Sequence, residues 1–167
     1  MIVRPEREED FAQVAAVVGA AFGSPVEPKL VEDLRALPGY LPEIALVADD
    51  GDGDVSGHVM FTLTHLEDGT AILMLSPLAV RPDRQRQGVG SALVEEGLRR
   101  CRERDEPLAI VEGDPGYYSR FGFVQATELG LERPLESTPI RAFQALALPG
   151  HRPLGGKVVY PPPFDGL

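Results

Sequence analysis

The chain has 167 residues, 43% of them hydrophobic, and a single cysteine. This is enough for one domain that buries its own core without disulfides or a structural metal. The formal net charge of −10 argues against nucleic acid as a partner, because such binding needs many Lys and Arg contacts to phosphate. No apolar run reaches the roughly 18 residues of a membrane span, and no signal-peptide pattern opens the chain. We expect one cytoplasmic domain over residues 1–167.

The first half of the chain predicts a strand, two helices and then three strands. Apolar residues recur at helical spacing in the first helix, which predicts an amphipathic helix whose apolar side faces the core: Phe11, Val14, Ala15, Val18 and Phe22. The expected ranges are a strand at 1–4, helices at 8–22 and 27–37, and strands at 44–48, 55–65 and 71–80.

The acidic segment 49–54 is expected to be a hairpin turn. A calcium-binding loop would need a glycine and a glutamate where Val55 and Phe61 stand. The three histidines have none of the spacings typical of metal ligands. We therefore expect no metal.

The second half predicts a long helix followed by shorter elements. The helix covers residues 88–104 and has one apolar side, formed by Val89, Leu93, Val94, Leu98 and Cys101. The strands at 71–80 and 108–111 flank this helix as a βαβ unit, so they should be parallel. A helical turn is expected near 117–120, ended by Gly122, and strands at 123–126, 140–148 and 157–160.

The segment from Leu73 to Gly90 is the most informative one. An apolar strand ends in charged turn residues, and Gly88 and Gly90 then open the long helix. The first backbone N–H groups of a helix have no intrahelical partner, and bare glycine backbone lets an anion approach them. This predicts a main-chain phosphate site, although an ordinary strand–loop–helix with glycines at its entry is the alternative.

Two other phosphate-binding patterns do not fit. A dinucleotide fold would have a third glycine at the place of Leu93, and a P-loop would have a lysine after its last glycine. Residues 81–104 carry seven arginines against four acidic groups in an otherwise acidic chain. Arg84 and Arg86 lie in the loop itself and are the candidates for a ligand's charges.

Two motifs carry a family resemblance. The run Gln85-Arg86-Gln87-Gly88-Val89-Gly90 is similar to the Gln/Arg-x-x-Gly-x-Gly/Ala pattern of the GNAT N-acetyltransferase superfamily. Tyr118-Ser119-Arg120-Phe121-Gly122-Phe123 resembles its later Tyr-x-x-x-Gly-Phe signature, and the tail at 160–164 looks like that of one bacterial branch. The resemblance implies an α/β fold with a mixed central sheet, splayed between the strands at 71–80 and 108–111 and flanked by helices.

The resemblance also implies a cofactor site for acetyl-CoA. Residues 85–91 would hold its pyrophosphate, and its pantetheine arm would pair with the strand end. The implied cofactor-binding residues are Leu78, Ala79, Val80, Gln85, Arg86, Gln87, Gly88, Val89, Gly90 and Ser91. Pro77 cannot donate to a sheet ladder, so we expect a bulge at Ser76-Pro77, unless the strand ends there.

The implied reaction is direct attack of an amine on the thioester. The N–H of Leu78 would stabilise the oxyanion, and Tyr118 would protonate the departing thiolate, with Tyr117 as the competing tyrosine. Many relatives have a glutamate on the strand before the loop, but residues 72–80 contain none. Glu112 is the candidate base; a surface role for it, with proton loss through water, is the alternative.

The acceptor is left open by the sequence. It is a small amine or a protein amine, with the early helices at 11–37 and the hairpin at 127–139 as the expected acceptor site. A homodimer is possible in this fold. Two alternatives remain: a non-catalytic acyl-CoA sensor on the same fold, and an unrelated phosphate-binding protein.

Overall fold

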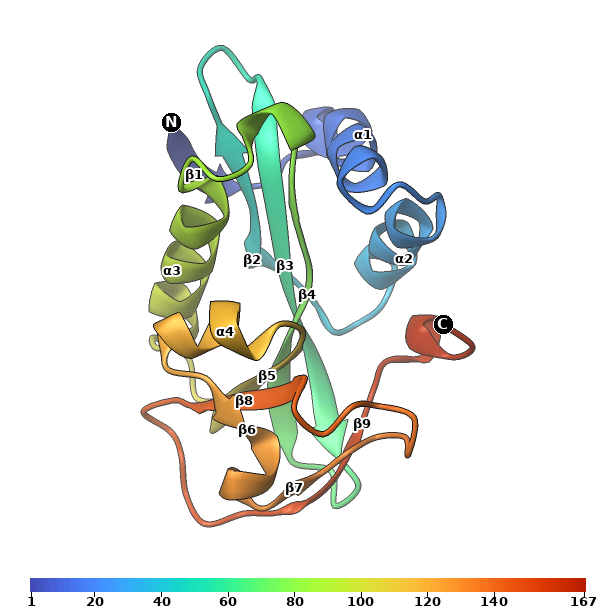
Figure 1. The fold of residues 1–167 in the computed structure, drawn as a ribbon, viewed down its shortest axis with the longest axis vertical. Coiled ribbons are helices and arrows are strands. Elements are labelled where there is room, and N and C mark those ends of the chain that lie inside the picture. The colour runs from blue at the N-terminus through green and yellow to red at the C-terminus, as the bar shows by residue number, and fades with distance from the viewer. The chain divides into compact units, whose positions relative to one another are not determined.

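The computed structural model describes residues 1–167, which form two compact units. One comprises residues 1–62 and 76–100, and the other comprises residues 63–75 and 101–167. The strands β3 (Val55–Leu66) and β4 (Ala71–Val80) run through both units. The elements of each unit can be followed by colour and label in Figure 1.

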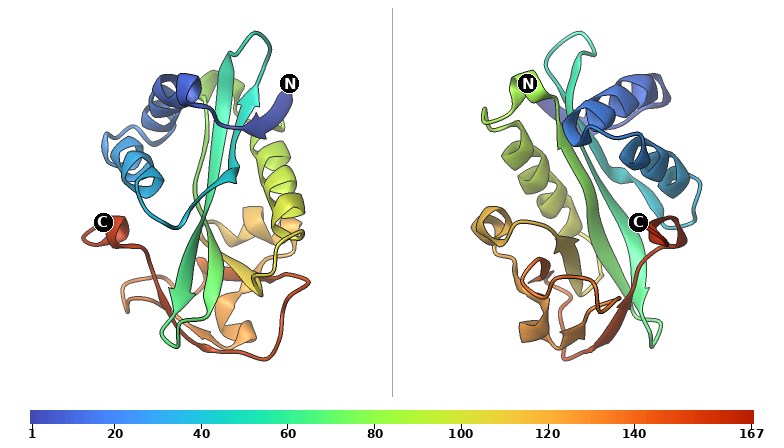
Figure 2. Two further views of the ribbon diagram at one scale, coloured as in Figure 1. Left: turned by 180° about the vertical axis from the view of Figure 1, so that it is seen from behind. Right: turned by 45° about the vertical axis from the view of Figure 1, so that its right-hand side comes forward.

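The first unit contains an antiparallel set of strands with helices on both faces. The strand β1 (Ile2–Pro5) pairs with β2 (Tyr40–Asp49), which pairs with the first part of β3. The helices α1 (Phe11–Phe22) and α2 (Val26–Arg35) lie side by side on one face, and α3 (Val89–Cys101) lies on the other (Figure 2). The turn between β2 and β3 is the expected hairpin turn.

The buried stripe of α1 is narrower than its sequence suggests. Val14, Val17 and Val18 are buried, but Phe22 is 46% exposed and Ala15 is exposed as well. The expectation that Ala15 and Phe22 face the core is wrong, because only the stripe that contains Val14, Val17 and Val18 meets the sheet. The helix ends at Gly23, whose φ of 64° lets its N–H reach the carbonyl of Gly19.

The apolar side of α3 is confirmed. Its five expected core residues, Val89, Leu93, Val94, Leu98 and Cys101, are at most 3% exposed. The helix ends at Cys101, three residues earlier than expected. A Cβ atom at Gly97 would lie 2.3 Å from Cε2 of Phe61, so the absence of a side chain lets the helix approach β3.

The second unit contains a parallel pair extended by antiparallel strands. Residues Leu73 to Leu75 of β4 pair in parallel with β5 (Leu108–Glu112), as the βαβ pattern predicted. On its other side β5 pairs with β8 (Phe143–Ala147), and β8 pairs with β6 (Val124–Gln125). The strand β9 (Gly156–Val159) pairs with the end of β3 and with a short strand that the sequence did not indicate, β7 (Leu131–Glu132).

The core of the second unit lies under β4, β5 and β8. Its buried members include Ile72, Met74, Leu108, Ile110 and Phe143, and Tyr160 and Phe164 of the C-terminal segment pack against it.

The remaining elements of the chain are α4 (Pro115–Tyr118) and 3-10 turns at Glu8–Asp10, Pro82–Arg84, Ser119–Phe121, Ala126–Leu129 and Pro162–Phe164. None of the helices combines the length and apolar character of a membrane span.

The strand β4 continues through its proline. The Ser76–Pro77 peptide bond is cis, and the strand runs on to Val80. The alternative that Pro77 ends the strand early is therefore wrong. The bulge at this dipeptide stays a prediction, and the parallel ladder to β5 covers Leu73 to Leu75.

Candidate active site

The loop before α3 has the backbone of an anion site. Arg86 and Gly88 both adopt positive φ, at 62° and 87°. The N–H of Ala92 donates to the carbonyl of Gly88 over 3.0 Å as the first helical hydrogen bond. The N–H groups of Val89 and Gly90 therefore precede the hydrogen-bonded helix, where the positive end of its dipole lies. Main chain in this conformation can hold a phosphate.

Both glutamine side chains of the loop are used to fasten it. The amide of Gln85 donates to the carbonyl of Val80 at 3.1 Å, and that of Gln87 donates to the carbonyl of Asp83 at 3.1 Å. Each bond closes the loop on residues four or five positions earlier. These side chains fix the shape of the loop, and its backbone is left to meet a ligand.

The arginines around the loop differ in their partners. Nη2 of Arg84 lies 2.7 Å from the Asp50 carboxylate, and Arg81 bonds to Asp83 at 2.7 Å. Arg86 is exposed on the turn itself. Of the two arginines that the sequence proposed for ligand charges, Arg86 is thus the more available one, since Arg84 already has an acidic partner.

Gly57 brings the end of β4 and the start of α3 together in the first unit. A Cβ atom there would lie 2.9 Å from Cγ1 of Val89 and 3.2 Å from the carbonyl oxygen of Ala79. Next to it, the N–H of Arg81 donates to the carbonyl of Ser56 at 2.8 Å. The two groups of expected cofactor residues, 78–80 and 85–91, are thus held against the same point of β3. No local pattern of the sequence indicates this role of Gly57.

In the second unit Tyr118 is held by an aromatic cluster. It is 9% exposed and meets Tyr117 edge-on, with ring centroids 5.0 Å apart, and Phe123 at 5.8 Å. A Cβ atom at Gly113 would lie 2.7 Å from Cε2 of Tyr118, so this glycine makes room for the ring. Burial, with a smaller contribution from Tyr117, raises the pKa of the Tyr118 hydroxyl. It therefore stays protonated at neutral pH.

The neighbouring Tyr117 has a different environment. It is half-buried, and the Arg120 guanidinium lies 4.5 Å from the centre of its ring. The turn that carries both tyrosines starts at Asp114, whose carboxylate accepts the N–H of Gly116 at 2.9 Å. Of the two tyrosines in this turn, Tyr118 is the buried one.

Glu112 lies at the end of β5, one residue before the glycine that Tyr118 packs against. Its side chain is exposed, and its Oε2 accepts a hydrogen bond from the Tyr160 hydroxyl at 3.0 Å. Burial, and then the adjacent carboxylate, raise the pKa of Tyr160, which remains a proton donor to Glu112. The two residues are 48 positions apart, so no local pattern of the sequence could have paired them.

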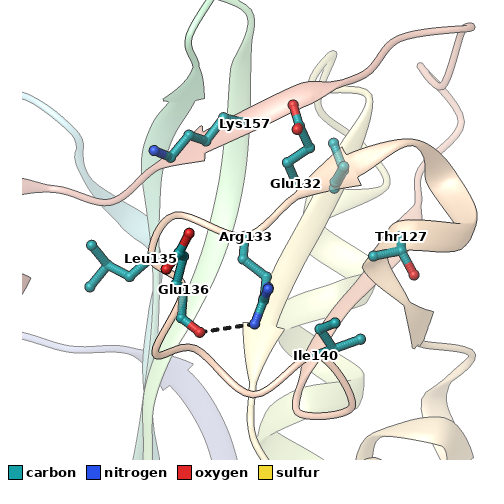
Figure 3. A pocket seen from close by; sticks show the side chains of 8 residues that line it. Thr127, Glu132, Arg133, Leu135, Glu136, Ile140 and Lys157 are labelled. Carbon is teal, nitrogen blue, oxygen red and sulfur yellow. Dashed lines mark hydrogen bonds between the residues drawn. The ribbon is translucent and has the colours of Figure 1, made fainter.

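The hairpin region expected to receive the acceptor lines a hollow of about 370 Å³ (Figure 3). Its lining residues are Thr127, Leu131, Glu132, Arg133, Leu135, Glu136, Ile140 and Lys157. The Arg133 side chain is tied down, because Nη1 donates to the carbonyls of Glu136 and Thr138 at 2.9 and 3.0 Å. Charges of both signs therefore surround this hollow.

Comparison with known proteins shows which family has this fold and these motifs. The family model of the acetyltransferase (GNAT) domain matches residues 2–126. The uncharacterized N-acetyltransferase YhbS of Escherichia coli is 37% identical over 124 residues, which are 74% of this chain and 73% of that protein. A crystal structure of YhbS in complex with CoA aligns with a TM-score of 0.90 and 32% identity, over 98% of this chain and 91% of that one.

A second solved structure agrees. A GNAT family acetyltransferase from Brucella melitensis in complex with acetyl-CoA aligns with a TM-score of 0.80 and 32% identity, over 98% of this chain and 97% of that one. The expected GNAT fold, with its mixed sheet and flanking helices, is confirmed.

The chain thus belongs to the GNAT acetyltransferase family. It is an acetyl-CoA-dependent N-acetyltransferase, and its relatives do not favour the binding-only alternative.

Proposed function

We propose that the chain transfers the acetyl group of acetyl-CoA to a primary amine by direct attack, with residues 1–167 acting as one catalytic domain. The observation that carries this proposal is the main chain of residues 85–90, shaped as an anion site at the start of α3 and fastened by the Gln85 and Gln87 amides. Relatives whose structures contain CoA or acetyl-CoA support this choice of ligand.

In the proposed complex the cofactor is held mainly by backbone. The N–H groups of Gly88, Val89 and Gly90, with Ser91 in the same helical turn, bind the pyrophosphate, and exposed Arg86 adds positive charge. The pantetheine arm pairs with the main chain of Leu78, Ala79 and Val80. Gly57 supports this arrangement, because it holds Ala79 and Val89 at one point of the sheet.

The reaction needs one nucleophile, one acid and one acceptor for the ammonium proton. The neutral amine nitrogen attacks the thioester carbon, the N–H of Leu78 stabilises the oxyanion, and the C–S bond then breaks. Tyr118 gives its proton to the departing thiolate and regains one from solvent. Burial raises the pKa of its hydroxyl, which therefore carries the proton to be donated throughout the neutral range.

The ammonium proton leaves to Glu112, directly or through water. Glu112 is the acidic residue at the end of β5, and its exposed side chain is oriented by Tyr160. Loss of the proton to water alone is the competing route. Glu112→Gln distinguishes the two, because only the first route predicts a fall of kcat that is largest at low pH.

Calorimetric titration with acetyl-CoA tests the cofactor site. We expect micromolar binding by the parent and none by Gly90→Glu, which puts a bulky negative side chain at the proposed pyrophosphate position. Ala12→Glu, an equal charge change at an exposed position of α1, is the matched control and should bind as the parent does. Equal binding by parent and Gly90→Glu would remove the cofactor from this loop.

Turnover is then measured through the CoA thiol that the reaction releases. The chain's single cysteine does not disturb this readout, because Cys101 is fully buried and burial raises the pKa of its thiol to about 12. Failure of every amine in a broad panel, despite cofactor binding, would contradict the proposed transfer to amines.

A further inference from the structure

A second hollow in the second unit lies beside the proposed base. It has a volume of about 330 Å³ and is built largely by the C-terminal segment, which contributes Val158, Val159, Tyr160, Phe164 and Asp165. These residues lie beyond the 2–126 region that the GNAT domain model matches. The volume is in the range of small-molecule sites.

Two aromatic rings form one wall of this hollow. The centroids of Tyr160 and Phe164 are 5.6 Å apart, with the rings tilted by 57°. Both rings pack against the core of the unit, so they are supported from behind. Leu135, 60% exposed, extends the apolar lining toward the hairpin. Such a wall suits an apolar body and, through the ring faces, a cation.

The charges of the hollow favour a cation as well. Glu67 and Asp165 contribute carboxylates, and Lys157 is the one basic residue of the lining. The two carboxylates therefore outnumber the single ammonium group of the lining. The lining is thus acidic overall, as an amine that arrives as an ammonium ion requires.

A chain of contacts connects the hollow to both proposed catalytic residues. Tyr160 lines the hollow and donates its hydroxyl proton to Glu112 at 3.0 Å. The next residue, Gly113, is the one against which the Tyr118 ring packs, and its N–H is fixed to the carbonyl of Ala142 at 3.0 Å. The lining of the hollow in Figure 3, in contrast, contains as many basic as acidic residues, and none of its residues is hydrogen-bonded to Glu112.

We infer that the hollow between Tyr160, Phe164 and Asp165 binds the acceptor, a primary ammonium ion on an apolar body, and that Tyr160 is a positioning residue for Glu112. This inference rests on the proposed transfer to amines. The rings take the apolar body, and the carboxylates of Glu67 and Asp165 attract the positive charge. Tyr160 has two roles in this arrangement: its ring contacts the acceptor, and its hydroxyl orients the base Glu112.

Kinetics with 2-phenylethylamine, ethanolamine and taurine as probes test the class of acceptor. All three are primary amines; the first has an apolar body, the second a small polar one and the third a negative charge. We expect kcat/KM to be at least tenfold higher for 2-phenylethylamine than for ethanolamine, and lowest for taurine. A preference for taurine or ethanolamine would overturn the inference while leaving amine acetylation intact.

Paired variants locate the acceptor. Phe164→Ala should raise KM for 2-phenylethylamine at least tenfold and leave KM for acetyl-CoA unchanged. Ile140→Ala, which truncates a residue that lines only the hollow of Figure 3, is the matched control and should change neither constant. The opposite outcome, with Ile140→Ala raising KM and Phe164→Ala silent, would move the acceptor to that hollow and overturn the assignment.

Tyr160→Phe tests the positioning role separately. The ring remains and only the hydroxyl that bonds to Glu112 is lost, so KM for 2-phenylethylamine should change less than twofold while kcat falls about tenfold. In a Glu112→Gln background the same substitution should have no further effect on kcat. Equal effects in both backgrounds would show that Tyr160 acts independently of Glu112. If the parent acetylates none of the amines, the proposed function itself is wrong. The assay of the parent protein therefore distinguishes this outcome from a failure of the inference about Tyr160.

Discussion

The Arg35 guanidinium donates two hydrogen bonds, of 2.9 and 2.8 Å, to the buried carboxylate of Glu6. The Tyr40 hydroxyl also donates to this carboxylate at 2.7 Å, and Nε2 of His58 lies 3.0 Å from it. Since Arg35 belongs to α2, Tyr40 to β2 and His58 to β3, one carboxylate joins three elements of the first unit. The network therefore fixes α2, a part of the expected acceptor region, to the sheet.

Arg35→Met should lower the free energy of unfolding by about 3 kcal/mol, because it leaves a buried carboxylate without its ionic partner. The methionine keeps an apolar stem over the Phe11 ring, which the guanidinium now covers at 3.8 Å. Urea unfolding measures the loss. Lys29→Met on the same helix removes an exposed pair with Asp33 and should leave stability nearly unchanged. Equal losses in both variants would contradict the importance of burial.

Acid should weaken the fold through Glu6. Burial raises the pKa of this carboxyl, but the hydrogen bonds to Arg35 and His58 together lower it by a larger amount. The net result is a pKa of about 2, compared with the usual 4.5. A pKa lower in the folded than in the unfolded chain gives stability that is present above pH 4.5 and lost as the pH falls toward 2. Unfolding free energies measured across this window should fall less steeply in Glu6→Gln than in the parent. Parallel curves would assign the acid sensitivity to other carboxyl groups.

Gly97→Ala should destabilise the chain although alanine is the better helix former. Its Cβ atom would lie 2.3 Å from the fully buried Phe61 ring, and overpacking of this kind costs about 1–3 kcal/mol. Gly19→Ala is the matched control on α1, where the nearest atom is Cγ of Pro28 at 3.4 Å. That variant should be neutral or more stable by up to about 1 kcal/mol, which thermal unfolding resolves.

Tyr118→Phe should reduce kcat by about 10²–10⁴-fold while acetyl-CoA binding is retained, since only the proton donor is removed. Because burial raises the pKa of Tyr118 above its usual value of 10.0, the parent should lose no activity through this group below that pH. The pH profile of kcat in the parent and titration calorimetry of the variant test both statements. Tyr117→Phe is the control, and a larger loss there than in Tyr118→Phe would exchange the roles of the two residues.

Local sequence patterns predicted much of the fold. The apolar side of α3, the hairpin turn after Asp49 and the parallel pairing of β4 with β5 were predicted, because each depends on residue spacing within one or two elements. The two errors in α1, Ala15 and Phe22, arose because spacing shows which residues share a side but not how wide a stripe the sheet covers. The two-residue strand β7 is too short to have a period of its own.

In the candidate site, too, some features could be predicted from the sequence and others are visible only in the tertiary structure. The sequence predicts the loop at 85–91 from its glycine spacing, and the resemblance to the GNAT family implies the tyrosine four residues before Gly122; both lie in short contiguous motifs. Only the tertiary structure decided that Tyr118 rather than Tyr117 is the buried tyrosine, that Gly57 holds the loop to the end of β4, and that Tyr160 bonds to Glu112. Those relationships join residues whose neighbours are chosen by packing and hydrogen-bond geometry, and no spacing along the chain encodes them.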